Sequence, residues 1–392
     1  MTAMEREQFV QTVMTSVRAH GVGDAEYSAD EFSVHHSDGR VIYLDNIFRE
    51  CQHLDAEESG ERITAFVAAM TSSDEVPEDW DSVRPMLRSV LRPVTLGQDG
   101  PRPLHRAAFP FIDEVVVVDL PRTRSFVSVD QAATWGVTVE QVFAEARNNL
   151  AALSKPGSPD DLEILRFVDD GDSYFASWLL VPGWLAGYAG GQFRPVAFIA
   201  ENDALLIVPD DPELLVEVFE MVEQQYRDAA RPVSPQGYTV DEHGTVVPFD
   251  EAGAHPSMPL ALRARAGLAA TEYSIQTDYL NNTFEEFLEL PDLDIDPAYA
   301  ATVNYEESTD GAFTSVVWGE GVEYLLPETD VVRFLRRDDN DEVELLCTVP
   351  FPTVVEILGL TPLPTIEPTR FEARHWPDPT ALARLVAADI EQ

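Results

Sequence analysis

Apolar residues near the start of the chain recur at the spacing of a helix, with Phe9, Val13 and Val17 on one face of about residues 6–19. The same periodicity predicts further helices over about residues 60–70, 78–90, 139–153, 213–229, 260–287, 353–358 and 380–389. Short apolar runs between turn residues predict strands over about residues 31–35, 40–44, 114–120, 126–129, 162–168, 174–181, 195–200, 204–208, 238–240, 245–248, 301–305, 313–318, 331–336, 342–347 and 370–374. This mixture of helices and strands predicts an α+β fold.

The chain is long for one hydrophobic core, because 392 residues exceed the usual size of a domain. A connection rich in proline and glycine starts at Arg231 and continues to Pro259, where apolar periodicity resumes. We therefore expect two lobes, residues 1–235 and 259–392, each a mixed or antiparallel sheet with flanking helices. A further split of the first lobe near residues 100–112 remains open. The competing hypothesis is that the helix beginning near Leu260 packs across the first lobe and joins the two.

One stretch is long enough to raise the question of a membrane span. Residues 173–193 carry no charge, but Pro182 and Gly183 lie in the middle and three more glycines follow. A spanning helix tolerates such residues poorly, so a buried strand over 174–181 followed by a glycine-rich loop is the better interpretation. We expect no membrane association.

The net charge is extreme and spread along the chain. Seventy acidic residues face 26 basic ones, giving −44, and Lys155 is the single lysine. Residues 1–250 contain 43 acids and 18 bases, and residues 251–392 contain 27 and 8. Even spreading favours adaptation to high salt, or an arginine-preferring genome, over a local acidic docking tail. Direct binding of nucleic acid is not expected, because it requires a basic patch.

The two cysteines, Cys51 and Cys347, lie far apart and form no CxxC motif, which indicates a reducing compartment. The N-terminus has no apolar signal core, so the sequence predicts a cytoplasmic protein.

Cys51 with His53 resembles a nucleophile and base, but no third group lies at suitable spacing. The residues from Asp292 resemble the start of a calcium-binding loop, but the residues that this motif requires at its later positions are missing. No metal and no cofactor is therefore expected.

Polar residues at the ends of predicted elements are the remaining candidates for a functional surface. Asp45 and Asn46 lie at a strand-to-helix junction, which is a common place both for a site and for a helix cap. Glu50 follows in the same helix, and Asn202 and Asp203 lie in a turn between two strands. No catalytic residues can be assigned from the sequence.

Several phrases of the first lobe resemble the YtpQ-like family of uncharacterised bacterial proteins. They are VIYLDNIFRE, DEVVVVDLPRTRSFVSVD, WGVTVEQVFAEARNNL, SWLLVPGW and PVAFIAENDALLIVPD, within about residues 1–250. The phrase EGVEYLLPETDVVRF is similar to the C-terminal half of longer actinobacterial members. The resemblance implies kinship and an α+β domain of unknown function. It supplies no activity and no site residues.

Three functional hypotheses remain. The first is a non-catalytic binding, adaptor or regulatory protein that acts through protein–protein contacts, which the lack of a catalytic constellation favours. The second is an enzyme whose site is assembled from dispersed carboxylates such as Asp45, Glu50 and Asp203. A ligand cleft would favour it. The third is an acidic decoy for a basic partner, which clustering of acids on one face would favour. The oligomeric state is not determined by the sequence.

The first prediction concerns salt. A net charge of −44 repels itself, and at ~1 M salt the screening length falls to roughly 3 Å. We therefore expect the midpoint of thermal unfolding to rise between dilute buffer and high sodium chloride. A midpoint that stays constant or falls would contradict adaptation to high salt.

Overall fold

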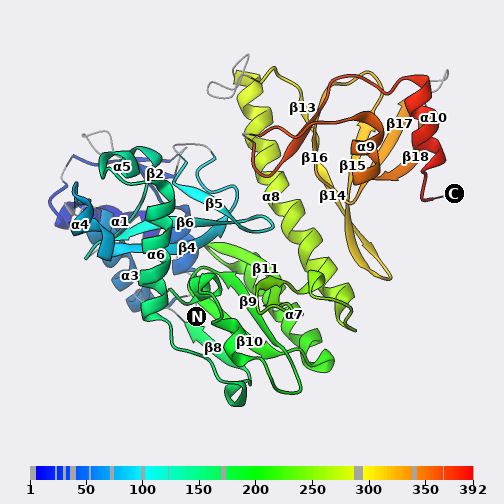
Figure 1. Ribbon diagram of the computed structural model, residues 1–392. Coiled ribbons are helices and arrows are strands. Elements are labelled where there is room, and N and C mark those ends of the chain that lie inside the picture. The colour runs from blue at the N-terminus through cyan, green and yellow to red at the C-terminus, as the bar shows by residue number, and fades with distance from the viewer. Residues whose placement is uncertain are drawn as a thin grey trace.

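The computed structural model describes residues 6–22, 24–29, 32–35, 41–52, 54–70, 75–98, 102–121, 123–168, 174–286, 295–337, 342–364 and 366–391. In these ranges the chain forms helices together with antiparallel and mixed sheets, so the predicted α+β class is confirmed. Figure 1 shows two bodies on either side of the long helix α8 (Met258–Glu286), one formed by the blue-to-green part of the chain and one by the yellow-to-red part.

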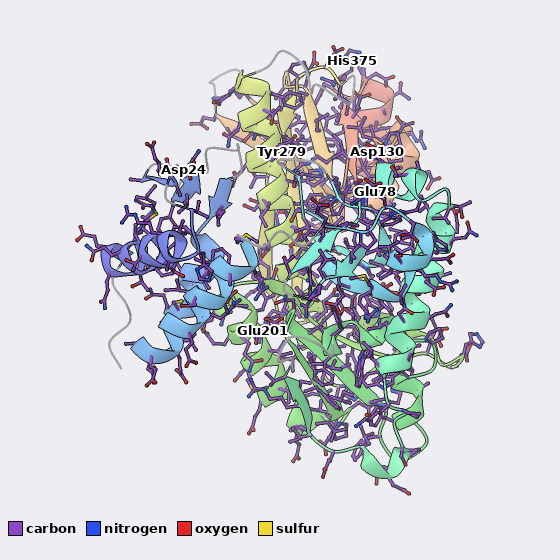
Figure 2. The ribbon with its side chains drawn as sticks, turned by 90° about the vertical axis from the view of Figure 1, so that its left-hand side faces the viewer. Asp24, Glu78, Asp130, Glu201, Tyr279 and His375 are labelled. Atoms are coloured by element: carbon purple, nitrogen blue, oxygen red, sulfur yellow. The ribbon has the colours of Figure 1, made fainter. Side chains whose placement is uncertain are left out.

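The first body begins with a small helical unit. It contains α1 (Arg6–Ala19), β1 (Glu26–Ser28), β2 (Ser33–His35), β3 (Val41–Tyr43), α2 (Asp45–Cys51) and α3 (Ala56–Met70). The three strands form an antiparallel sheet in the order β1-β2-β3. Phe9, Val13 and Val17 of α1 share one buried cluster with Ile63 and Val67 of α3, as their helical spacing predicts. In Figure 2 this unit, marked by Asp24, lies on the side of the molecule opposite Glu78 and Asp130.

A second sheet has the order β4-β6-β5, with β7 also paired to β6. Its elements are α4 (Trp80–Val83), η1 (Arg84–Met86), β4 (Leu87–Pro93), β5 (His105–Phe109), β6 (Ile112–Asp119), β7 (Arg124–Phe126), α5 (Val129–Thr134) and α6 (Val139–Leu153). Thr138 caps α6 in a reciprocal capping box with Gln141. The helix predicted over 78–90 is wrong beyond Met86. Pro85 is tolerated only near a helix start, and the residues from Leu87 form strand β4, which is buried at Leu87 and from Ser89 to Leu91.

The third sheet completes the first body, in the order β12-β11-β9-β10-β8. Its elements are η2 (Pro159–Asp161), β8 (Leu165–Val168), η3 (Phe175–Leu180), η4 (Leu185–Tyr188), β9 (Pro195–Glu201), β10 (Ala204–Pro209), α7 (Pro212–Asp228), β11 (Pro232–Val240), β12 (Val246–Pro248) and η5 (Phe249–Glu251). Helix α7 packs on β9 and β11 through Val218, Phe219 and Val222.

Two expectations fail in this sheet. The buried strand predicted over 174–181 is the 3-10 helix η3, because an apolar run by itself does not distinguish the two. The connection predicted at 231–237 is part of the buried strand β11. Pro232 is tolerated as the first residue of the strand, and Pro235 because the register shifts between Ser234 and Gly237. In the described part of the chain, no helix is both long and apolar enough to cross a bilayer.

The C-terminal body is built on α8. It contains β13 (Tyr299–Ala300), β14 (Val303–Ser308), β15 (Gly311–Gly319), β16 (Tyr324–Pro327), β17 (Val331–Arg337), β18 (Val343–Pro350), α9 (Phe351–Leu358), β19 (Arg370–Ala373) and α10 (Pro379–Ala387). The strands form two sheets, β14-β15-β17-β18 and β13-β16-β19. Both sheets are mixed, because β15 pairs with β17 and β13 with β16 in parallel, while the other pairs are antiparallel.

Helix α8 contacts both bodies. Ala261, Ala264 and Leu268 belong to the core of the first body. On the other side α8 packs against β14 and β15, and the turn at Gly311 approaches it closely. A Cβ atom at Gly311 would lie 2.7 Å from the carbonyl oxygen of Pro259, so glycine is required there. The helix that the sequence assigned to the second lobe thus also completes the core of the first.

A buried arginine ties α8 to the smaller C-terminal sheet. The Arg370 side chain is fully buried and donates to the side chains of Gln276 (2.5 Å) and Thr277 (2.7 Å) on α8. It also donates to the backbone carbonyls of Ala301 (2.9 Å) and Leu325 (2.8 Å). Burial lowers the pKa of Arg370 to about 10, so it is charged at neutral pH. One side chain therefore satisfies polar groups on three separate segments.

The second prediction tests this arginine. Arg370→Met keeps a long apolar side chain but removes every donor, leaving buried acceptors that cost about 1–3 kcal/mol each. We expect urea unfolding to show a loss of roughly 3 kcal/mol or more. The control is Arg336→Met, which breaks an exposed pair with Glu344 and should cost below about 1 kcal/mol. Equal losses in the two variants would contradict the role of Arg370.

Candidate functional site

A cleft of about 780 Å³ lies where the first body, α8 and the C-terminal body meet. Its volume is within the range of pockets that enclose a ligand. The walls come from the β5–β6 hairpin, which Figure 1 shows extending toward α8, from α8 itself and from segments of the C-terminal body. The lining residues are Val94, Ala107, Ala108, Phe109, Pro110, Phe111, Ile112, Asp113, Glu251, Arg265, Ala266, Ala269, Tyr273, Thr314, Glu328, Thr329, Asp330, Pro352, Glu367, Pro368 and Thr369.

The tip of the β5–β6 hairpin forms the aromatic wall. The ring of Phe109 packs against Tyr238 of β11, with centroids 4.6 Å apart. The ring of Phe111 meets Tyr273 of α8 edge to face, with centroids 5.6 Å apart. Such pairs contribute about 0.5–1.5 kcal/mol beyond the area they bury. The hairpin tip is therefore anchored to both β11 and α8.

Four charged side chains meet at one end of the cleft. Arg102 donates to Glu367 (2.5 Å) and to Asp113 (3.1 Å), and His105 lies 3.2 Å from the same Glu367 oxygen. Glu367 belongs to the C-terminal body, whereas the other three belong to the first. These four side chains, here called the ionic group, therefore link the two bodies at one end of the cleft.

The contacts of His105 favour its charged form. Nδ1 lies 2.8 Å from the carbonyl oxygen of Pro103, and Nε2 faces the Glu367 carboxylate. Both neighbours are acceptors, so only the imidazolium, with two N–H groups, donates to both. The hydrogen bond with Glu367 accordingly raises the pKa of His105, and the same bond lowers the pKa of Glu367 to about 2. Loss of the His105 proton removes one contact between the bodies.

Two buried carboxyl groups have raised pKa values, namely Asp113 in this ionic group and Glu272 near it. Burial raises the pKa of Asp113 to about 6, although the charges of His105 and Arg102 oppose the shift. Burial also raises the pKa of Glu272 on α8 to about 7. Glu272 is 1% exposed and accepts a hydrogen bond of 2.7 Å from the Thr95 hydroxyl. Of the two, Asp113 lines the cleft, and perturbed acids in a cleft are typical of functional sites.

A second link between the bodies lies on another side of the cleft. Arg265 of α8 donates to Asp330 of the C-terminal body (2.7 Å) and lies 3.6 Å from Asp250 of the first body. Asp330 also accepts hydrogen bonds from the backbone N–H (2.7 Å) and hydroxyl (2.9 Å) of Thr314. Glu251 and Glu328, which line the cleft nearby, are exposed. They form no ion pair with another described residue.

His105, Asp113 and Glu367 are also a geometric candidate for a metal site. One donor atom from each lies within 4.8 Å of the others, and Nδ1 of His105 is held by a carbonyl, as in many metal-bound histidines. The guanidinium of Arg102, however, contacts an oxygen of both carboxylates. A cation would have to displace this arginine. The donor set fits an ion-pair network better than a metal centre.

The sequence-predicted residues lie elsewhere, and three of them are brought together. Arg231 binds Glu50 (2.9 Å) and Asp203 (3.3 Å), which joins α2 to the β9–β10 turn. Glu50 also pairs with Arg62 at 2.6 Å. Asn202 is buried, and its backbone N–H donates to the carbonyl oxygen of Arg231. These contacts neutralise the carboxylates, and none of the three predicted residues lines the cleft.

Asp45 and Asn46 are the first two residues of α2, so the predicted strand-to-helix junction is present. The N-cap position is Leu44, which provides no side-chain hydrogen bond. The side chains of Asp45 and Asn46 lie outside the described part of the structure, as does His53. Burial raises the pKa of the Cys51 thiol, which favours the uncharged and less nucleophilic form.

Sequence reasoning did not find the cleft residues. His105 and Glu367 are 262 positions apart, so no motif joins them. One local signal was present in Asp113 and Glu114, two acids at the start of an otherwise apolar strand. Glu114 has a structural explanation, because it pairs with Arg106 and Arg147. Asp113 beside it belongs to the cleft.

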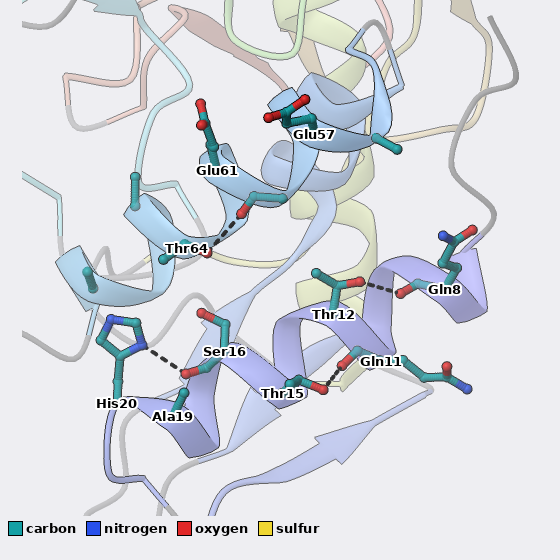
Figure 3. Close-up of a pocket in the computed structure, with 14 residues that line it drawn as sticks. Gln8, Gln11, Thr12, Thr15, Ser16, Ala19, His20, Glu57, Glu61 and Thr64 are labelled. Carbon is teal, nitrogen blue, oxygen red and sulfur yellow. Dashed lines mark hydrogen bonds between the residues drawn. The ribbon is translucent and has the colours of Figure 1, made fainter.

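A larger hollow of about 1050 Å³ lies between α1 and α3. Figure 3 shows hydrogen bonds from Thr12, Thr15, Thr64 and His20 within their own helices. Thr12 donates to the Gln8 carbonyl (2.9 Å) and Thr64 to the Gly60 carbonyl (2.8 Å). These hydroxyls already have partners, and the described lining of the groove includes no Phe, Tyr or Trp, whereas the cleft between the bodies has Phe109, Phe111 and Tyr273.

The third prediction uses the raised pKa of Glu272. The folded state holds this proton up to about pH 7 while the unfolded state releases it near 4.5, so its contribution to stability is lost as pH rises through this window. Glu272→Gln stays neutral and keeps an acceptor for Thr95. We therefore compare the free energy of unfolding in urea of Glu272→Gln with that of the parent at pH 5 and at pH 8. The difference should shift in favour of the variant by roughly 2–3 kcal/mol between the two pH values. A difference that does not change with pH would contradict the assignment.

No protein-family model matches this chain, and neither does any curated protein or solved structure in the comparisons. The resemblance to the YtpQ-like family therefore stays a prediction that rests on the sequence phrases.

Proposed function

We propose that this protein is a non-catalytic cytoplasmic binding protein, an adaptor or regulator, that acts through protein–protein contacts. The cleft between the two bodies is the docking site. The observation that carries the proposal is the composition of the cleft, where an aromatic and proline-lined wall faces a set of carboxylates. Apolar walls with a few charged groups are typical of recognition sites.

The alternative of an enzyme is favoured by the raised pKa values of Asp113 and Glu272. The positions of these groups support binding instead. Asp113 is held by Arg102, and Glu272 is covered and bonded to Thr95. Glu50 and Asp203, the dispersed carboxylates expected for an enzyme, are both paired with Arg231. The acidic-decoy alternative requires carboxylates gathered on an open face, whereas those of the cleft lie between two bodies.

The fourth prediction concerns obstruction of the cleft from each side. Ala107→Trp introduces an indole from the first body and Pro352→Trp from the C-terminal body, both at exposed lining positions. The control, Thr15→Trp, places the same group in the groove between α1 and α3. We expect affinity capture from the native host, read by quantitative mass spectrometry, to lose the same partner with both cleft variants and to keep it with the control.

Circular dichroism spectra and unfolding midpoints of the three variants establish that each is folded. Two cleft variants on different bodies are used so that misfolding of one leaves the other informative. Capture of no specific partner by the parent protein would contradict the proposed function. Capture that survives in folded cleft variants, or that is lost only with Thr15→Trp, would also contradict it.

A further inference from the structure

The cleft has an unbalanced set of charges. Among the described residues, its lining contains the five carboxylates of Asp113, Glu251, Glu328, Asp330 and Glu367 and one guanidinium, that of Arg265. Arg102 adds a positive charge at one end by binding Asp113 and Glu367. After these contacts and the pair of Arg265 with Asp330, the carboxylates of Glu251 and Glu328 remain exposed to the cleft.

The surroundings of Glu251 show that this negative charge is crowded. Asp250 is its neighbour in η5, and burial together with the charge of Asp250 raises the pKa of Glu251. Arg265 opposes the shift, but it is already engaged by Asp330 and lies close to Asp250. A further positive charge beside Glu251 would relieve this repulsion, and Glu328 adds a second exposed carboxylate to the same cleft.

The apolar wall limits what kind of cation fits. Phe109, Pro110 and Phe111 stand on the hairpin side, and Pro352 and Pro368 on the side of the C-terminal body. Long basic side chains match such a surface, because their methylene stems lie along apolar groups while the charged end reaches a carboxylate. A guanidinium or ammonium over a phenyl ring gains further attraction.

We propose that the cleft binds a short basic segment of a partner protein in which arginine or lysine alternates with apolar residues. The basic residues contact Glu251 and Glu328, and the apolar residues contact the hairpin tip and the two prolines. A small polyamine would satisfy the charges but leave the phenyl rings uncovered, and a bare metal ion would meet the guanidinium of Arg265. This inference rests on the proposed function, because it names the chemistry of the segment that docks there.

A test must separate the cleft from the general attraction between a basic peptide and a protein of net charge −44. The probe is a short fluorescein-labelled peptide that alternates arginine and leucine. One analogue has glutamate in place of arginine and a second has serine in place of leucine. Binding is measured by fluorescence anisotropy at about 0.15 M salt, where long-range attraction is screened beyond about 8 Å.

The fifth prediction compares two double variants of equal net charge. Glu251→Gln with Glu328→Gln removes two carboxylates from the cleft. Glu163→Gln with Glu217→Gln removes two exposed carboxylates outside it. We expect the cleft pair to weaken binding of the arginine–leucine peptide by about tenfold or more and the control pair by less than about twofold. Both analogues should bind at least about tenfold more weakly than the parent peptide.

Equal weakening by the two double variants would overturn the inference, because it would show non-specific attraction. Two further results are binding of the serine analogue as strong as that of the parent peptide, and competition by spermine as effective as that by unlabelled peptide. Either result would overturn the inference, because it would show that the cleft recognises charge alone and not the apolar residues of the segment. The tryptophan variants Ala107→Trp and Pro352→Trp separate this result from the proposed function. If these tryptophan variants lose the host partner while the arginine–leucine peptide shows no preference for the cleft, the proposed docking site is supported. The inference that the docked segment is basic is then wrong.

Discussion

Burial of helix α8 on two opposite sides is the constraint on which the rest of the structure depends. Its residues Ala261, Ala264 and Leu268 complete the core of the first body, and its opposite side packs against β14 and β15. A helix covered on both sides loses apolar burial if either body moves away, so it fixes their separation. Arg370 strengthens this arrangement, because its guanidinium donates hydrogen bonds both to side chains of α8 and to a backbone carbonyl of the smaller C-terminal sheet.

The cleft is a consequence of this arrangement. With α8 as its floor, the hairpin tip at Phe109–Phe111 and the segment before β19 stand opposite each other, and ionic contacts cross between them. Arg102 and His105 meet Glu367 on one side, while Arg265 lies between Asp250 and Asp330 on another. Ionic links of this kind respond to pH and salt more than apolar packing does, so the rim of the cleft is its most adjustable part.

The sequence predicted most long elements because periodicity reports burial directly. The helices at α1, α6, α7 and α8 show this. Its errors have physical causes. At Leu87–Pro93 a proline-containing 3-10 turn precedes a strand, and local spacing does not separate the two. At Pro232–Val240 prolines suggested a connection, whereas Pro232 begins the strand and a register shift lets Pro235 remain inside the sheet. Strand β16 was missed, because it is short and buried on both faces.

The sequence by itself determined the α+β class and the strong negative charge, because composition and periodicity are properties of neighbouring residues. It also identified Glu50, Asn202 and Asp203 as polar ends of elements, and the structure brings these three together at Arg231. The cleft was decided by tertiary structure. His105, Asp113 and Glu367 come from two bodies, and their pKa shifts arise from burial and from one another. Such effects depend on distances across the fold, which the order of residues does not specify.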